Sequence, residues 1–210
     1  MSERNLHDAF EAARSHAPCV LFLDELDAIG FARRKRSSSV GQTLVDQLLQ
    51  ELDAIGSDNR SLLVLAATNA PWDVDDALLR PGRLDRRIFV PPPDEPARRE
   101  ILAIYTRGVH AVSLDLGRIA GRTPLFSGAD LKALVEQAID AVIDEALETT
   151  TEPPLTTAHL ERALNAVRPT TFEWLARAQN YIEFANEDRR YDGIAKFLRS
   201  GEAHKYQRQE

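Results

Sequence analysis

The sequence predicts an α/β fold, in which a small sheet with flanking helices is followed by an all-helical part. Two short apolar runs, at 19–23 and 62–65, each end in polar residues, as buried strands of an open sheet do. Amphipathic periodicity at 3–16 and 40–52 predicts the flanking helices. From Pro96 onward the pattern is helical, which predicts a small bundle.

Composition places the chain among ordinary soluble proteins, with 43% hydrophobic and 28% charged residues in 210. The net charge of −7 argues against general binding of nucleic acid, which is contacted mainly by Lys and Arg. A single cysteine, Cys19, excludes a disulfide framework within the chain. No signal peptide is evident, and no apolar run approaches the roughly 20 residues of a membrane span, so a cytoplasmic location is predicted.

The run at 19–23 predicts a buried central strand that delivers Asp24 and Glu25 at its carboxyl end. Ligands bind at this end of the strands in an open α/β sheet. Consecutive strand residues point to opposite faces, so one acid could hold a hydrated metal ion while the other reaches a reacting water. The alternative is a strand that ends in solvated acids.

The second predicted strand, at 62–65, runs into Thr68 and Asn69. If the two strands are neighbours, Asn69 lies one position along the sheet from the acids. Its amide offers a donor and an acceptor, which suits orienting a water between Glu25 and a phosphate. A turn residue before Pro71 is the alternative.

Two segments are rich in cations. The run from Arg33 to Arg36 predicts an exposed loop, which as a run of four cations is most simply a solvated face. The segment at 79–87 places several arginines beside a Pro-Gly turn, and a guanidinium can engage two phosphate oxygens at once. A surface cluster of salt bridges is the alternative for this segment, with the nearby acids Asp75, Asp76 and Asp85.

Residues 88–90 predict a short third strand, closed by the Pro-Pro-Pro-Asp run at 91–94. Ser127 and Asp130 form a capping box at the start of the longest predicted helix. Further helices are predicted at 98–107, 114–120, 127–147, 157–167 and 172–185, with a last one around 194–198. The aromatic residues after Pro169 either pack against the bundle or are covered by a partner.

Gly128 and Ala129 lie at the start of the longest helix. Exposed amides and small side chains there would let a nucleotide base or phosphate approach closely. An ordinary first turn of a helix is the alternative.

Four motifs follow one another in a specific order. LFLDE at 21–25 resembles a Walker B strand, and AATN at 66–69 resembles a sensor-1 segment. DDALLRPGRLDR at 75–86 is similar to the second region of homology, and FSGADL at 126–131 completes the set. Together they resemble the AAA ATPases over roughly residues 2–167. Asp76 and Leu84 stand where proline and phenylalanine are common, but neither difference removes a charged group.

This resemblance implies the domain organisation. Residues 1–95 would form a partial AAA large α/β subdomain of the P-loop NTPase class, 96–168 the helical lid, and 169–210 a C-terminal helical extension. The implied activity is hydrolysis of ATP with Mg²⁺, coupled to remodelling of a protein substrate. The implied assembly is a homo-oligomeric ring, a hexamer, without a membrane partner.

The resemblance also assigns roles to residues. Asp24 would hold Mg²⁺ through water, Glu25 would polarise the attacking water, and Asn69 would position it. Arg83 and Arg86 would be arginine fingers, which complete a neighbouring subunit's site. Gly128 and Ala129 would contact the nucleotide.

A phosphate-binding loop is missing from the sequence. Such a loop needs Gly-x-x-x-x-Gly-Lys, and none of the ten glycines here is followed by lysine. The resemblance therefore implies the C-terminal part of a longer ATPase module. The alternatives are a non-catalytic ring or scaffold subunit that lends its arginines and a docking surface, and a nucleic-acid-binding module built on Arg33 to Arg36.

Overall fold

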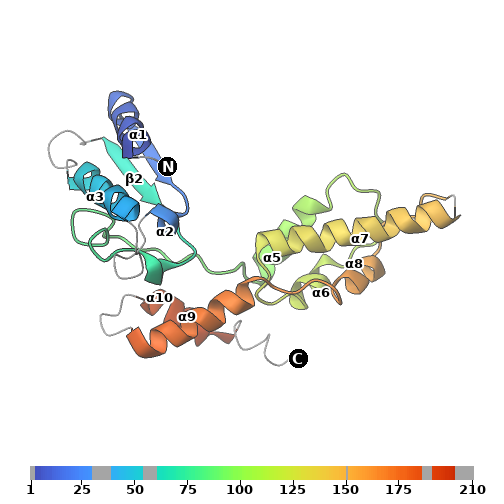
Figure 1. Ribbon diagram of the computed structural model, residues 1–210. Coiled ribbons are helices and arrows are strands. Elements are labelled where there is room, and N and C mark those ends of the chain that lie inside the picture. Colours follow the sequence, from blue (N-terminus) through green and yellow to red (C-terminus); the bar gives the residue numbers. More distant parts are fainter. Residues whose placement is uncertain (1–2, 30–38, 54–60, 150, 186–190, 202–210) are drawn as a thin grey trace. The chain divides into compact units, whose positions relative to one another are not determined.

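The computed structural model describes residues 3–29, 39–53, 61–149, 151–185 and 191–201. The loop from Arg33 to Arg36 lies outside the described residues. The chain divides into two compact units, Met1–Ile88 and Phe89–Glu210 (Figure 1).

The first unit is built on a two-stranded parallel sheet. Strand β1 (Cys19–Leu23) pairs with β2 (Leu62–Ala66) in the register Cys19↔Leu62 to Leu23↔Ala66. Both predicted strands are confirmed, and they are neighbours in the sheet. The helical elements among the described residues of this unit are α1 (Glu3–Ser15), α2 (Leu26–Ile29), α3 (Ser39–Asp53) and the 3-10 turn η2 (Pro71–Asp73).

One face of the sheet carries the core of this unit. Leu23 and Leu62 point to this face and pack with Leu6 and Phe10 of α1 and Leu48 of α3. The three helical side chains are fully buried. Burial of each such side chain stabilises the fold by about 1.5–3 kcal/mol. The apolar spacing of both helices therefore reflects a single contact surface, the core face of the sheet.

The other face of the sheet is exposed and apolar. Val20, Phe22, Leu63 and Leu65, which we call the open sheet face, are 58%, 53%, 60% and 49% exposed. The prediction of a strand buried on both sides is therefore wrong, because the described residues cover only one face. Period-2 alternation places half of each apolar run on the uncovered side.

The predicted third strand at 88–90 is also absent from the described structure. The segment has no strand hydrogen bonds, and Ile88 and Val90 are 85% and 81% exposed. A strand exists only where a neighbouring strand satisfies its backbone groups, and no described segment pairs with this one.

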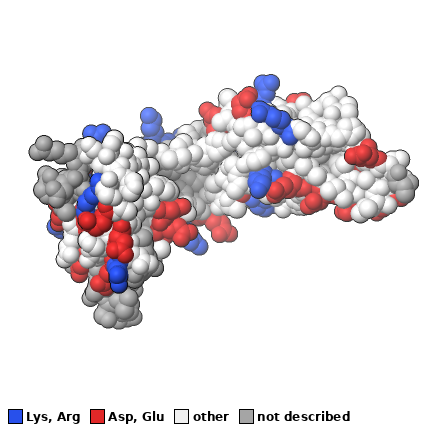
Figure 2. All heavy atoms as spheres, turned by 90° about the horizontal axis from the view of Figure 1, so that it is seen from above, with Lys and Arg blue, Asp and Glu red and all other residues white. Residues whose placement is uncertain are grey.

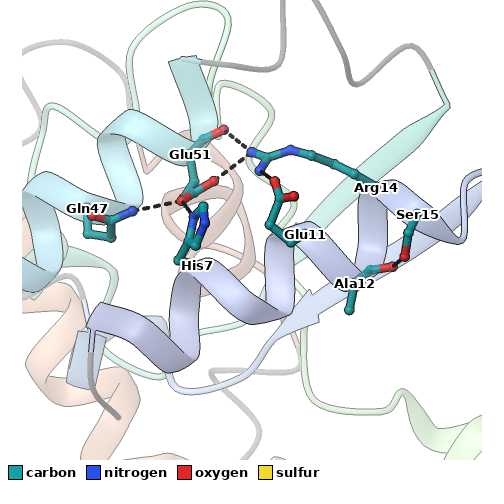
Figure 3. Close-up of polar contacts among 7 residues, drawn as sticks. All are labelled: His7, Glu11, Ala12, Arg14, Ser15, Gln47 and Glu51. Atoms are coloured by element: carbon teal, nitrogen blue, oxygen red, sulfur yellow. Dashed lines mark hydrogen bonds and ion pairs between the residues drawn. The ribbon is translucent and has the colours of Figure 1, made fainter.

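A buried carboxylate, that of Glu51, joins α1 to α3 (Figure 3). His7 Nδ1 and Gln47 Nε2 each lie 2.7 Å from its Oε1, and Arg14 Nη2 lies 2.6 Å from its Oε2. Arg14 also binds Glu11 at 2.7 Å. Burial alone would raise the pKa of Glu51, but hydrogen bonds from His7, Arg14 and Gln47 more than offset it, so this pKa is lowered. The carboxylate therefore stays ionised and pins the two helices together.

The second unit is helical, as predicted. The helices α5 to α9 each start within three residues of the predicted position. Their bounds are α5 (Glu95–Tyr105), α6 (Leu116–Gly121), α7 (Gly128–Thr149), α8 (Thr157–Ala163), α9 (Thr171–Ala185) and α10 (Asp192–Leu198). Leu102, Ile119, Leu131 and Leu160 are fully buried and form the centre of the core. None of the described helices is long and apolar enough to cross a membrane.

Arg98 of α5 is a fully buried cation. Its Nε and Nη2 donate to Ala120 O at 3.1 and 3.0 Å, and its Nη1 donates to Pro93 O at 2.8 Å. Backbone carbonyls thus replace the water that this guanidinium loses on burial. The arginine fixes the proline run at 91–93 to the helices of this unit.

Trp174 of α9 and Phe197 of α10 pack against Phe89 within the second unit, whereas Phe172 and Tyr181 are exposed. The Phe89 ring stacks on Trp174 with centroids 6.1 Å apart and meets Phe197 edge-on at 5.7 Å. A Cβ on Gly193 would lie 3.2 Å from Phe89 Cβ, so the missing side chain leaves room for this ring. Leu175 is buried against Leu125 beside the cluster.

Candidate catalytic edge

The parallel pairing brings polar residues together at one edge of the sheet. Asp24 and Glu25 follow β1, and Asn69 follows β2 by three residues. Backbone hydrogen bonds continue past the strands, from Ala67 N to Leu23 O at 2.9 Å and from Leu26 N to Ala67 O at 2.8 Å. The structure therefore places all three predicted site residues of this region at the same carboxyl-end edge.

The chain turns sharply at Glu25, which has a φ of 52°. This left-handed conformation costs a non-glycine residue roughly 1–2 kcal/mol. The Glu25 amide donates to Asp24 Oδ1 at 2.8 Å, and both residues are exposed. The turn thus ends β1 and leaves the carboxylates of Asp24 and Glu25 exposed to solvent.

Thr68 links the two segments that follow the strands. Its Oγ1 donates to Asp27 Oδ1 at 2.5 Å and accepts from Ala70 N at 3.0 Å. Asp27 lies in α2, directly after the Glu25 turn. Sequence analysis missed this pair, because a separation of 41 residues follows no periodicity; the only sequence signal is the position of each residue beside a motif.

Arg83 is bound within the chain. Its Nε and Nη2 contact Asp53 Oδ1 and Oδ2 at 2.6 and 2.7 Å, and its Nη1 donates to Ala77 O at 2.7 Å. The hydrogen bond from Arg83 lowers the pKa of Asp53, and the same contact raises the pKa of Arg83. Sequence analysis allowed for a salt bridge here but pointed to nearer acids and missed Asp53.

Arg86 differs from Arg83 in both exposure and partners. Its side chain is exposed, whereas that of Arg83 is 19% exposed. Within the described ranges Arg86 makes neither a hydrogen bond nor an ion pair. The turn that contains Arg83 is held by a hydrogen bond from Gly82 N to Asp85 Oδ2 at 3.2 Å, and Gly82 has a φ of 85°, which favours glycine.

The start of α7 holds the remaining predicted site residues, in the second unit. Asp130 Oδ2 accepts from Ser127 N and Oγ at 2.8 Å each, and Ser127 Oγ accepts from Asp130 N at 3.1 Å, which confirms the capping box. Thr170 donates to the same carboxylate through Oγ1 at 3.2 Å. A side chain at Gly128 would meet nothing within 4 Å, and Ala129 is exposed. The start of α7 is therefore open at Gly128 and Ala129, although Asp130 and Leu131 of the same turn are buried.

In the first unit, Asp24, Glu25 and Asn69 fit one end of a site for Mg-ATP. The exposed Asp24 carboxylate accepts a hydrogen bond from one amide and retains lone pairs for a metal-bound water. Among the described residues, no three His, Cys, Asp or Glu side chains form a metal-binding group. The amides and lysine that would hold the β and γ phosphates are missing from the sequence. The chain thus offers two carboxylates and an amide at one edge of the sheet, without a phosphate-binding loop.

Comparison with known proteins assigns both units. Residues 1–92 match the ATPase family associated with various cellular activities (AAA), and residues 113–157 match the AAA+ lid domain. The chain is 39% identical over 195 residues to a cell division cycle protein 48 homolog of Archaeoglobus fulgidus, an alignment that covers 87% of this chain and 26% of that protein.

Two further relatives show the same pattern. The ATP-dependent zinc metalloprotease FtsH of Thermus thermophilus is 48% identical over 141 residues, 63% of this chain and 22% of that protein. The cell division control protein 48 homolog B of Arabidopsis thaliana is 35% identical over 195 residues, 90% of this chain and 31% of that protein. The chain therefore spans less than a third of the length of each of these relatives.

Proposed function

The chain belongs to the AAA ATPase family, and on that premise we propose that it forms the water-activating part of an ATPase. This ATPase would assemble as a hexameric ring and would remodel or unfold protein substrates. The observation that carries the proposal is the shared edge of β1 and β2, where Asp24, Glu25 and Asn69 lie together. Some relatives are named as ATP-dependent, which supports ATP as the nucleotide. A cytoplasmic location remains a prediction from the sequence.

Bound Mg-ATP would supply the phosphoryl group that is transferred to water. Glu25 would accept the proton of the attacking water, since its carboxylate is solvent-accessible and lies at the carboxyl end of the strands. Asn69 would orient that water through its amide, and Asp24 would bind a water of the metal's hydration shell. The first turn of α7, at Gly128 and Ala129, would contact the nucleotide.

The phosphate-holding segment would come from outside this chain, because its sequence contains no Gly-x-x-x-x-Gly-Lys loop. The open sheet face supports the presence of such a segment beside the sheet, because large contiguous apolar surfaces on a folded protein mark contact sites. A covering segment with a phosphate-binding loop would bury Phe22 and its neighbours and complete the site. Arg83 and Arg86 would then act at the boundary between subunits.

The test uses the complete ATPase module, in which this chain is joined to its phosphate-binding loop. Glu25→Gln preserves size but cannot act as a base, so turnover should fall by about 10²–10⁴-fold while nucleotide binding persists. The matched control is Glu100→Gln, at an exposed glutamate of α5, which should hydrolyse ATP at the wild-type rate. Hydrolysis by Glu25→Gln close to wild type would contradict the proposal.

A second candidate function is a non-catalytic ring subunit that lends arginines and a docking surface. The missing phosphate-binding loop favours it. The two functions differ in whether Glu25→Gln has any effect, because a subunit that never hydrolyses ATP does not use that base. A nucleic-acid module has less support, since the chain carries a net charge of −7. On the face drawn in Figure 2, the described Lys and Arg are scattered among Asp and Glu. A salt titration of binding to DNA and RNA tests this last alternative.

A further inference from the structure

The second unit contains a pocket between its first residues and its last described helix. The volume of this pocket is about 420 Å³, which is the usual size of a site for a small molecule. Most of its wall is carbon, from three proline rings, a methyl group, an isobutyl group and a phenyl ring. The lining consists of residues 91–93, Asp94, Ala97, Leu125, Phe197 and Ser200.

Contacts within the unit fix two sides of this pocket. Arg98 Nη1 donates to Pro93 O at 2.8 Å, which holds the proline run against α5. On the other side, the ring of Phe197 meets the ring of Phe89 edge-on, with centroids 5.7 Å apart. Ser200 N donates to Phe197 O at 2.8 Å, so the backbone of Ser200 is fixed as well. The pocket is therefore largely pre-formed, as small-molecule sites are.

Leu125 forms a further wall in a strained backbone conformation. Its φ is 64°, in the left-handed region, which is unfavourable for a residue with a side chain. The side chain is buried, and the backbone carbonyl accepts a hydrogen bond from Thr171 Oγ1. Strain of this kind persists only where the surrounding structure enforces it, and it clusters at ligand-binding sites. The conformation of Leu125 thus agrees with a binding role for this pocket.

Two polar side chains in the lining differ in depth. Ser200 Oγ is buried and has no hydrogen-bond partner among the described residues. Such a hydroxyl has lost its hydrogen bonds to water without replacing them, which costs free energy. Asp94 is exposed, and its Oδ1 accepts from Ala97 N at 2.9 Å at the start of α5. The pocket therefore presents a hydrogen-bonding group inside and a negative charge at its rim.

We propose that this pocket binds a small aromatic amine that carries a hydroxyl group at the end opposite its ammonium group. The aromatic ring would lie against the proline rings and Phe197. The hydroxyl group of the ligand would bond to Ser200 Oγ, and the ammonium group would lie beside the carboxylate of Asp94. None of the residues that line the pocket takes part in the proposed function, so the two proposals stand separately.

The test is a titration of the full chain with tyramine, followed by NMR of methyl groups. The methyl groups of Ala97 and Leu125 line the pocket, so their signals should shift and saturate together. A Kd on the order of 1 mM is expected for a probe of this size. The methyl group of Ala138, buried in the core of the same unit, is the control and should not shift.

Phenethylamine tests the contact with Ser200, because it differs from tyramine only in lacking the hydroxyl group. It should bind wild type about 2- to 10-fold more weakly than tyramine, which is the effect of one hydrogen bond. In Ser200→Ala the two amines should bind within about twofold of each other, since the hydroxyl group of tyramine has lost its partner.

The probe 4-hydroxyphenylacetate tests the contact with Asp94, because it carries a carboxylate where tyramine carries its ammonium group. It should bind wild type more weakly than tyramine. Asp94→Asn should narrow this difference by about 2- to 5-fold, the effect of an exposed charge. Asparagine also caps helices well, so this variant keeps the start of α5 intact.

Ala97→Leu blocks the pocket, because its larger side chain occupies part of the volume and leucine is a good helix former. The shift at Leu125 on adding tyramine should disappear. If the Ala138 signal shows that this variant is misfolded, Phe197→Leu takes its place. That variant removes the aromatic wall and should weaken tyramine binding by about 2- to 10-fold.

Three results would overturn the proposal. The first is that tyramine causes no saturating shift at Ala97 and Leu125 of wild type. The second is an unchanged Kd in the folded blocking variant. The third is a preference for tyramine over phenethylamine that persists in full in Ser200→Ala, which would mean that the hydroxyl group binds elsewhere.

Discussion

Thr68 and Asp27 are joined by a hydrogen bond of 2.5 Å between Oγ1 and Oδ1, although they lie 41 positions apart in the sequence. The bond connects the turn after β2 to α2, which follows β1. Glu25 lies two residues before Asp27, and Asn69 directly follows Thr68. The hydrogen bond therefore fixes the spacing between the residue proposed as base and the residue proposed to orient water.

Thr68→Val should destabilise the chain and weaken catalysis together. Valine has nearly the same shape but cannot donate to Asp27 or accept from Ala70 N. We expect a loss of about 1–3 kcal/mol in the free energy of unfolding, measured by denaturant titration. Asp27→Asn with Thr68→Val completes a double-mutant cycle. If the two losses simply add, the residues do not interact and the prediction is wrong.

Arg86→Ala should abolish hydrolysis in a ring of identical subunits. Arginines that act on a neighbouring subunit's phosphate contribute roughly 10³–10⁵-fold to the rate. Mixing Arg86→Ala subunits with Glu25→Gln subunits should restore part of the activity, because some interfaces then combine an intact base with an intact arginine. Mixed rings that form but stay inactive would show that Arg86 does not act across the interface.

The His7 contact should make stability depend on pH. Its hydrogen bond with Glu51, reinforced by the charge of Glu51, raises the pKa of His7 above the usual value of 6.5. A raised pKa in the folded state stabilises the fold fully below the unfolded value, and this stabilisation is lost as pH rises through the folded value. The melting midpoint of wild type should therefore exceed that of His7→Gln at about pH 5.5, and the difference should shrink towards about pH 8.5.

The control for this measurement is His110→Gln, at an exposed histidine of the second unit. It should show no such pH-dependent difference from wild type. Equal midpoints of wild type and His7→Gln at both pH values would mean that the imidazole contributes nothing to the contact between α1 and α3.

The chain by itself should bind dyes that recognise apolar surface and should bind no Mg-ATP saturably. The first property follows from the open sheet face, and the second from the missing phosphate-binding loop. Phe22→Ser with Leu65→Ser should reduce dye fluorescence without unfolding the chain. The comparison variant, Leu23→Ser on the core face, should unfold the first unit and increase fluorescence. Micromolar binding of ATP by the chain would refute the second expectation.

Local patterns were sufficient to predict most elements. The strands at 19–23 and 62–66 and the helices around them follow from apolar periodicity, and the capping box of Asp130 follows from a spacing of three. The failures depend on segments that pack from elsewhere. Whether Phe22 is buried, and whether residues 88–90 form a strand, is decided by what lies beside them, which their own sequence does not contain.

The same limit applies to the candidate site. The sequence could predict that Asp24, Glu25 and Asn69 lie together if their strands are neighbours, because parallel neighbouring strands end at one edge. The pairs Asp53 with Arg83 and Thr68 with Asp27 could not, since separations of 30 and 41 residues reflect no helical or strand period. Only the folded chain shows which acid each donor meets.

Helix α3 has a mechanical consequence. Its 15 residues form a stiff rod of about 22 Å, which begins directly after the cation-rich segment at 30–38 in the sequence. The far end of the rod holds Asp53, and through it Arg83. Because Arg83 binds both carboxylate oxygens of Asp53, any tilt of α3 would move the turn that contains Arg83 with it.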